Sequence, residues 1–189
     1  MRHQPDGAEH DFDAVIGAAR ARESWALEHL YTALAPAVAG FFRLQRAAEP
    51  EDLTSEVFAG VLRNIPTFRG DESHFRSWVF TIAYRRLADE RRAASRRPHV
   101  RPLDGVLEPV DAADVEADVA RLLATRRVRE LCATLPPAQR DVLLLRLVGR
   151  MTVDEVAALM ERSRGAVKAL QRRGLATVTA VVDARGVPL

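Results

Sequence analysis

Aromatic, strand-forming and cross-linking residues are scarce in this chain of 189 residues. Aromatic residues make up only 6% against 48% hydrophobic residues, so Ala, Leu and Val must fill most of any core. The sequence has few Ile and Tyr and almost no apolar/polar alternation, which predicts an all-α fold. The only cysteine, Cys132, cannot form an internal disulfide. Its apolar neighbours favour a small core residue over a redox thiol.

Long apolar runs and a strong net charge are also missing. No run of 18 apolar residues occurs, because Arg146 interrupts the best candidate, so no membrane insertion is expected. The start of the chain is polar and acidic without an apolar signal core, which predicts a cytoplasmic protein with a disordered tip over residues 1–10. The net charge is only +2, so any basic character is local.

Helical periodicity divides the chain into two parts. It is nearly continuous over residues 11–93, where Pro36 is expected to start or kink a helix and Pro66 to end one. We expect three groups of apolar residues to face the core of this first part. They are Trp25, Leu27, Leu30, Tyr31 and Leu34; Leu53, Val57, Phe58, Val61 and Leu62; and Phe75, Trp78, Val79, Ile82 and Ala83. A second helical domain is expected over residues 125–185.

The stretch between these parts has the charge pattern of a linker. Residues 85–101 hold seven arginines against two acids, whereas residues 104–118 hold six acids and no Lys or Arg. Segregated blocks of this kind, punctuated by Pro and Gly, are not a core pattern. We therefore expect a flexible linker over residues 94–124, basic and then acidic, between two small helical domains. The arginine block could track phosphates or be a solvated tail.

The strongest functional signal is a helix-turn-helix with a cationic second helix. Thr152 and Glu155 have the spacing of a capping box, and Ser163 is a good N-cap for the next helix. Val167 and Leu170 point inward by their spacing. The outward side is left to Arg164, Lys168, Ala169, Arg172 and Arg173. Such a helix can enter a DNA major groove, although a solvated helical hairpin is the alternative.

Signals of catalysis and of metal binding are missing. The five histidines are scattered without the spacing of metal ligands, and no Gly-rich phosphate loop occurs. Paired carboxylates such as Asp89 and Glu90 neighbour arginines and have the pattern of a helix surface. The sequence therefore predicts a non-enzymatic protein without a cofactor.

Motifs in both halves resemble the bacterial sigma factors of the extracytoplasmic-function (ECF) group, the minimal initiation subunits of RNA polymerase. Residues 51–58 (EDLTSEVF) are similar to the family's polymerase-clamp-binding helix. Residues 68–83, with FRG and then FRSWVFTIA, are similar to its promoter-melting segment. LPPxQR at 135–140 and the segment 155–168 match its upstream-element reader, although Glu161 stands where the family more often has Gly. The resemblance covers roughly residues 11–93 and 125–180.

The resemblance implies a sigma factor that binds core RNA polymerase and directs promoter-specific initiation on double- and single-stranded promoter DNA. It also implies regulation by an anti-sigma factor. Polymerase contacts fall on Asp52, Ser55, Glu56 and Arg63. Downstream-element and melting contacts fall on Phe68, Arg69, Gly70, Asp71, Ser73, Arg76, Tyr84, Arg85 and Arg92. Upstream contacts fall on the outward residues of the cationic helix named above.

Promoter opening needs a pocket, a π face and nearby cations to hold an extruded base. The Gly-containing loop at 68–73, beside Arg69, Arg76, Tyr84 and Arg85, offers these. Trp78 lies on an apolar stripe and is more often a core residue. Two other functions fit part of the pattern. One is a stand-alone helix-turn-helix regulator that binds symmetric operators without polymerase. The other is an adaptor whose basic faces bind only acidic protein partners.

Overall fold

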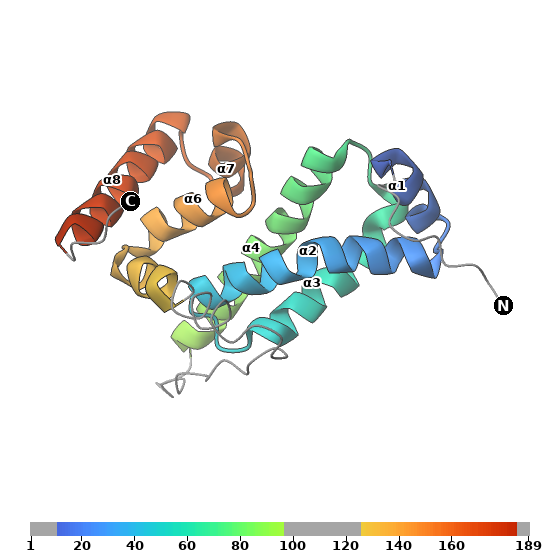
Figure 1. Cartoon of the computed structure of the whole chain (residues 1–189), viewed down its shortest axis with the longest axis horizontal. Helices are drawn as coiled ribbons and strands as arrows, with labels where there is room; N and C mark the ends of the chain where they lie inside the picture. The colour runs from blue at the N-terminus through green and yellow to red at the C-terminus, as the bar shows by residue number, and fades with distance from the viewer. Residues whose placement is uncertain (1–10, 97–125, 185–189) are drawn as a thin grey trace, which may run out of the picture.

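The computed structural model of the chain describes residues 11–96 and 126–184, which are helices joined by short loops (Figure 1). Within these ranges the fold is all-helical, as predicted. The tip over residues 1–10 and most of the predicted linker lie outside the described residues. No helix in the described ranges is long and apolar enough to cross a membrane.

The first half contains four α-helices and one short 3-10 helix. They are α1 (Phe12–Arg20), α2 (Ser24–Leu44), α3 (Pro50–Asn64), η1 (Ile65–Thr67) and α4 (Glu72–Arg96). Pro50 occupies the first turn of α3, followed by Glu51 and Asp52, which suits the positive end of the helix dipole. The α3 helix ends at Asn64 and Pro66 continues in η1. Pro36 lies inside α2 rather than starting a helix.

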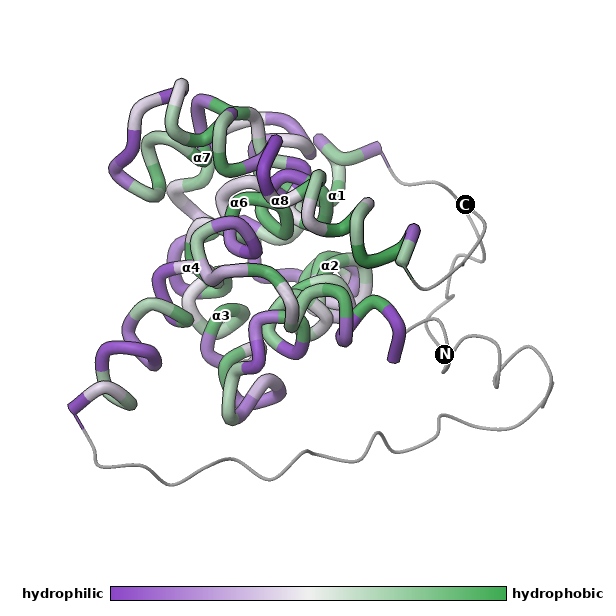
Figure 2. The backbone as a smooth tube through the Cα atoms, turned by 90° about the vertical axis from the view of Figure 1, so that its left-hand side faces the viewer, coloured by the Kyte–Doolittle hydropathy of each residue, from purple (hydrophilic) through white to green (hydrophobic). Residues whose placement is uncertain are grey.

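The core of the first half is rich in phenylalanine. Phe41, Phe42 and Phe80 are fully buried, and Phe41 packs edge-on against the other two rings at 5.6 and 5.7 Å. Three residues expected on the buried side lie instead at the surface, where they are 42–47% exposed: Trp25, Tyr31 and Leu62. In α2 the buried side is carried by Ala26, Leu30 and Leu34 together with further residues toward the helix end. Figure 2 shows hydrophobic and hydrophilic segments alternating along the helices.

The second half consists of a helix over residues 126–134 followed by α6 (Pro137–Leu147), α7 (Val153–Leu159) and α8 (Arg164–Ala184). Cys132 is buried, as predicted. The α8 helix approaches α6 closely at Gly174, where an added Cβ would lie 2.8 Å from a methyl carbon of Leu143. A larger residue at 174 would require the Leu143 side chain to move.

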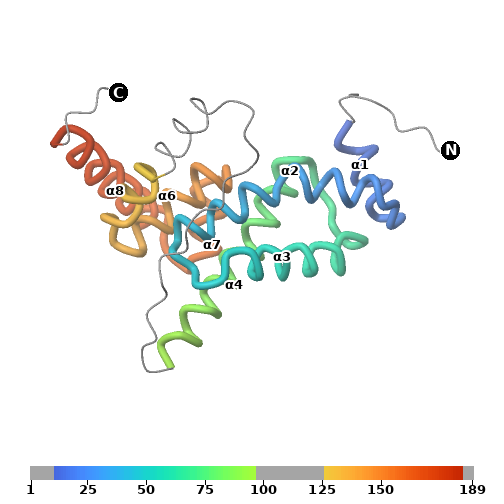
Figure 3. Tube along the Cα trace, turned by 60° about the horizontal axis from the view of Figure 1, so that its bottom comes forward, coloured from blue at the N-terminus to red at the C-terminus, as the bar shows by residue number. Residues whose placement is uncertain are grey.

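The two halves are in contact with each other. Buried residues of both halves belong to one continuous apolar cluster. The α4 helix runs to Arg96, and Figures 1 and 3 show its middle beside α6 and α7 while its last turns project from the bundle. Arg91 of α4 forms an ion pair with Asp141 of α6 at 3.0 Å. The second half therefore rests on one side of α4 in this structure.

Candidate nucleic-acid and polymerase interfaces

The expected helix-turn-helix is formed by α7 and α8, and its ends are fixed by capping. The Thr152 hydroxyl accepts a hydrogen bond from the Glu155 amide at 3.2 Å, and the Glu155 carboxylate accepts one from the Thr152 amide at 2.6 Å. This confirms the predicted capping box. The Ser163 hydroxyl likewise accepts from the Ala166 amide at 3.1 Å, which confirms the cap of α8.

The turn after α7 places Glu161 in the left-handed region at φ 53°. The next amide, of Arg162, donates to the Ala157 carbonyl at 2.9 Å. This 6→1 bond is typical of a Schellman ending, which usually has Gly at the left-handed position. Glu161 therefore carries backbone strain at the turn that aims α8.

The outward face of α8 is cationic. Val167 and Leu170 are buried against the rest of the second half, as predicted. Between Arg162 and Val182 the chain contains no Asp or Glu. Arg164 at the start of the helix pairs with Asp154 of α7 at 2.7 Å. Exposed on the outer side are Arg164, Lys168, Arg172 and Arg173, with Ala169 half-buried among them.

The loop that leads into α4 is held by a cap. Asp71 accepts hydrogen bonds from the His74 amide at 2.9 Å and from the Ser73 hydroxyl at 2.7 Å. These bonds hold the pKa of Asp71 well below its usual range. Gly70 has φ 140°, and an added Cβ would lie 2.7 Å from the Cβ of His74. Asp71 and Ser73, both predicted as DNA contacts, therefore also fix the start of α4.

An aromatic cluster packs beside this loop. Phe68 is 8% exposed and packs edge-on against Phe75 at 5.3 Å. The Phe68 ring also stacks on Trp78 at 5.2 Å. Arg20 donates a hydrogen bond to the backbone carbonyl oxygen of Phe68 at 2.6 Å. Trp78 is half-buried rather than a full core residue. The ring of Phe68 is therefore largely covered, and it serves mainly as packing for Trp78.

An open pocket of about 460 Å³, which we call the Trp78 cavity, lies beside this cluster. Trp78, Arg69 and Arg85 line it. Residues of the second half, Met151, Glu155, Ala158 and Leu159, line it as well. The guanidinium of Arg69 donates to the carbonyl oxygens of Pro66 and Phe68 at 3.0 and 2.7 Å, whereas Arg85 is exposed. An aromatic ring with cations near it is the combination that holds a single-stranded base beside its phosphate.

The remaining predicted contacts on α4 have protein partners in this structure. Arg76 donates to the Val148 carbonyl oxygen of the second half at 2.7 Å. Burial raises the pKa of Tyr84, and the charge of Asp141 and a hydrogen bond to it act in the same direction. Arg92 is exposed and pairs with Asp89 of its own helix. Only Arg92 among these three is turned toward solvent.

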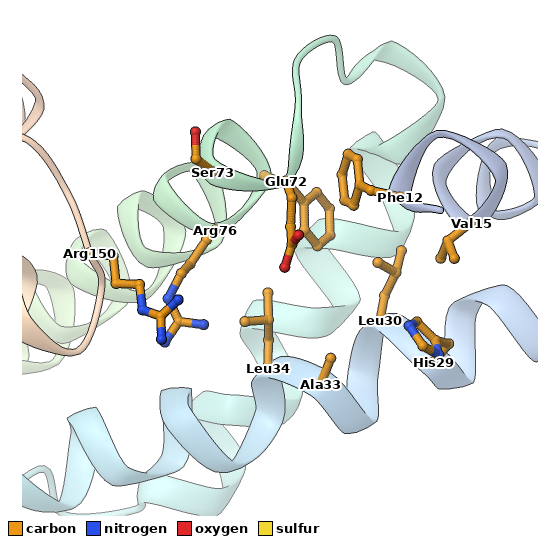
Figure 4. A pocket seen from close by; sticks show the side chains of 11 residues that line it. Phe12, Val15, His29, Leu30, Ala33, Leu34, Glu72, Ser73, Arg76 and Arg150 are labelled. Atoms are coloured by element: carbon orange, nitrogen blue, oxygen red, sulfur yellow. The ribbon is translucent and has the colours of Figure 1, made fainter. Parts of the chain in front are cut away.

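A second cavity, of about 300 Å³, lies between α1, α2 and the start of α4. Figure 4 shows the side chains of Arg76 and Arg150 reaching into the same part of it. Burial lowers the pKa of Arg76, and the nearby charge of Arg150 acts in the same direction. In residues 11–96 and 126–184 no group of three His, Cys, Asp or Glu side chains could hold a metal ion.

The predicted polymerase-binding residues lie on the exposed side of α3. Leu62 is 42% exposed and lies next to Arg63, so it adds an apolar contact to this polar surface. Helical spacing predicted that Leu62 would face the core, because it follows Phe58 by one helical turn and adjoins Val61, and both of these are buried. Glu56 is held by Arg86 of α4 at 3.4 Å. All four predicted residues, Asp52, Ser55, Glu56 and Arg63, are exposed.

Both halves match models of one protein class. The model of Sigma-70 region 2 matches residues 30–97, and that of Sigma-70 region 4 matches residues 125–178. A chain with these two regions has the promoter-recognition architecture of bacterial transcription initiation. The class defined by the fold and its interfaces is therefore that of the sigma-70-type factors.

Relatives narrow this class to one group. The chain is 33% identical to the ECF RNA polymerase sigma factor ShbA of Streptomyces griseus over 143 residues, which cover 70% of this chain and 71% of that relative. It is 31% identical to the ECF sigma factor BldN of Streptomyces coelicolor over 90% of this chain and 66% of BldN. It is 29% identical to SigD of Mycobacterium tuberculosis, covering 92% and 85%. The chain belongs to the ECF sigma factors, non-enzymatic subunits that direct RNA polymerase to promoters.

Among solved structures, the fold is similar to that of CnrH in complex with the cytosolic domain of CnrY. The TM-score is 0.62 at 22% identity, and the match covers 92% of this chain and 97% of CnrH. This similarity describes the fold.

Proposed function

We propose that this ECF sigma factor uses three separate surfaces to bring polymerase to a promoter and open it. The exposed side of α3 binds core polymerase, the first turns of α8 read the upstream element, and the Trp78 cavity holds the downstream strand. The observation that carries the proposal is that the three sets of contacts lie on different parts of the chain: α3, α8, and the loop before α4 together with α4. Polymerase binding and DNA reading can therefore occur at the same time.

For the upstream element, the argument rests on the outer face of α8. Lys168 and Arg172 are one helical turn apart and exposed, with half-buried Ala169 beside Lys168. A small residue between long cations lets the helix backbone approach the base edges. Arg173 and Arg164 lie where phosphates flank a groove-bound helix. Asp154 keeps Arg164 close to the N-terminus of α8.

For the downstream element, the argument rests on the cavity rather than on the loop alone. Trp78 offers a partly exposed ring, and Arg69 and Arg85 lie around the same opening. Base stacking on an aromatic residue contributes about 1–3 kcal/mol per base in single-strand binding. Asp71 and Ser73 would act by fixing the loop, because their side chains already hold the start of α4.

For polymerase binding, Leu62 is proposed as the apolar centre of the α3 surface. Truncation of a hot-spot residue near the centre of an interface weakens binding by about 2 kcal/mol or more, whereas rim charges contribute less. A protein partner of the anti-sigma kind is also proposed, since CnrH was solved in complex with the cytosolic domain of CnrY. We place the protein in the cytoplasm, where polymerase and chromosome lie.

The test is run-off transcription with purified core polymerase on genomic fragments, combined with co-purification. Leu62→Asp is expected to weaken polymerase binding at least about 10-fold. Leu147→Asp, which alters a leucine that is 67% exposed in the other half, serves as the matched control. Equal binding of both variants would contradict the α3 proposal. Specific binding to symmetric operators without polymerase would instead favour a stand-alone regulator.

A separate test addresses the downstream strand. The loop at residues 68–73 is exchanged for that of a related sigma factor, and open-complex formation is measured on a promoter library. The preferred downstream base is expected to change while the upstream preference stays the same. A pre-melted template is the control for duplex opening. An unchanged preference on both templates would place the reader on α4 instead of the loop.

A further inference from the structure

The smaller of the two cavities described above, about 300 Å³ between α1, α2 and the start of α4, has no role in the polymerase and DNA binding proposed so far. Its lining changes in character from one end to the other. Figure 4 shows Arg76 and Arg150 at one end, Phe12 and Val15 at the other, and Glu72 between them. We call this the Arg150 cavity.

Both guanidinium groups at the cationic end are positioned by the backbone. Arg76 donates from two of its three nitrogens to the Val148 carbonyl oxygen, at 2.7 and 3.2 Å. Arg150 lies in the turn after α6, in the left-handed region at φ 54°. The Met151 amide donates to the Leu145 carbonyl oxygen at 3.1 Å, and this bond closes the turn around Arg150. A residue with a Cβ is strained in that region, and such strain clusters at ligand-binding positions.

The charges of these two arginines are not neutralised by a carboxylate. Among the residues that the structure describes, no ion pair joins Arg76 or Arg150 to an acid. Glu72 precedes Arg76 by four residues, which favours an ion pair on a helix, yet Arg76 turns to Val148 instead. An anionic group between the two guanidinium groups would relieve their repulsion.

The other end of the cavity has a nonpolar wall. Leu30, Leu34 and Phe75 contribute to it, and all three are buried. Phe12 packs against Phe75 with 5.9 Å between the ring centres, and His29 lines the cavity from the exposed side of α2. A small apolar group would be favoured against this wall, because its surface would leave water without burying an unpaired polar atom.

Between these ends, Glu72 adds a group of the opposite charge. It is exposed on the first turn of α4, and Figure 4 shows its carboxylate pointing into the cavity. This carboxylate would repel a plain anion bound at the arginines, but it would attract an ammonium group that lies next to that anion. The cavity therefore offers, in order, an anion site, a cation site and an apolar wall.

From this order we propose that the Arg150 cavity binds a hydrophobic α-amino acid. The ligand carboxylate lies between Arg76 and Arg150, its ammonium group faces Glu72, and its side chain rests on Leu30 and Leu34. An α-amino acid carries these three groups on one carbon atom. The volume of about 300 Å³ is at the small end of the range for ligand sites, which suits a molecule of this size.

The experiment is calorimetric titration of the full chain, without polymerase or DNA, at about pH 7, where amino groups are largely protonated. The probe is L-leucine. L-Leucinamide lacks the carboxylate, 4-methylpentanoate lacks the ammonium group, and L-serine keeps both charges without the apolar side chain. L-Leucine is expected to bind with a Kd of about 1 mM or tighter, and each of the other three at least about 10-fold more weakly.

Two variants test the charged groups, each with a matched control. Arg150→Ala is compared with Arg22→Ala, because Arg22 is also an exposed arginine in the left-handed region, at φ 63°, and does not line the cavity. Glu72→Gln is compared with Glu28→Gln, which changes an exposed carboxylate of α2 outside the cavity. Far-UV circular dichroism confirms that each variant is folded.

Arg150→Ala is expected to weaken L-leucine binding at least about 10-fold and to leave L-leucinamide binding unchanged, since the amide has no carboxylate for Arg150 to bind. Glu72→Gln should remove the preference for L-leucine over 4-methylpentanoate, because the ammonium group loses its partner. Both control variants should bind L-leucine as the parent does.

Three results would overturn the inference. One is that L-leucine does not bind at concentrations up to about 10 mM. The second is that L-leucinamide and 4-methylpentanoate bind as tightly as L-leucine, which would show that the charged groups do not recognise the ligand. The third is that L-leucine binds equally to the Arg150→Ala and Arg22→Ala variants, which would place the amino acid outside this cavity.

Discussion

The turn between α7 and α8 offers a direct test of how backbone conformation fixes the orientation of α8. Glu161 sits at the left-handed position of the turn with φ 53°. A residue with a Cβ there costs roughly 1–2 kcal/mol relative to its usual conformations. Glycine avoids that cost but loses about 0.5–1 kcal/mol through its greater freedom in the unfolded chain. Glu161→Gly should therefore stabilise the second half by about 0.5–1 kcal/mol.

The assay is hydrogen exchange of the backbone amides in α7 and α8, because it reports the opening of this half separately from the first. Glu161→Ala is the control, since it removes the same charge and keeps the Cβ. It should change the opening free energy much less than Glu161→Gly. Glu161→Val should destabilise the turn, because a branched side chain fits the left-handed region poorly. Glycine and alanine variants of equal stability would refute the argument from backbone strain.

Three further predictions concern other parts of the second half. Lys168→Ala should weaken use of the upstream element by about 1–3 kcal/mol if it makes a base contact, measured on promoters with and without that element. Burial opposes ionisation of Glu155, but hydrogen bonds from Thr152 hold its pKa below the ordinary 4.5. Its contribution is therefore complete above about pH 4.5 and is lost as pH falls further. Acid unfolding should show this loss in the parent and not in Glu155→Gln. Burial raises the pKa of Cys132, so a thiol reagent should react with it at least about ten-fold faster in urea than in the native protein.

Local signals in the sequence predict the helix ends well. Thr152 with Glu155 and Ser163 before α8 behave as their spacing indicates, because a cap is formed by residues three positions apart. The inward positions Val167 and Leu170 also follow, since helical spacing determines which side chains share a face. The resemblance to sigma factors rests on such local patterns and is confirmed by both region models.

The sequence does not reveal contacts that depend on how helices meet. Trp25 and Tyr31 fit an apolar stripe by spacing, yet the structure buries Ala26 together with the predicted Leu30 and leaves those two exposed. The position of neighbouring helices decides which edge of a stripe is covered. In the sequence, Asp141 has the pattern of a surface acid next to Arg140. In the structure it pairs with Arg91, which is 50 residues away along the chain. A buried interaction over that separation leaves no local pattern in the sequence.

The absence of acids on most of α8 has a consequence for the conditions under which this protein acts. Each phosphate that a cation neutralises releases counterions, and the logarithm of the binding constant falls by about 0.9 per contact for each tenfold rise in salt. The two exposed cations assigned to phosphates, Arg164 and Arg173, allow two such contacts. A doubling of the salt concentration would then weaken upstream binding by about 3.5-fold. Under the proposed role of α8, binding to the upstream element would weaken as the salt concentration in the cell rises, without any separate sensor.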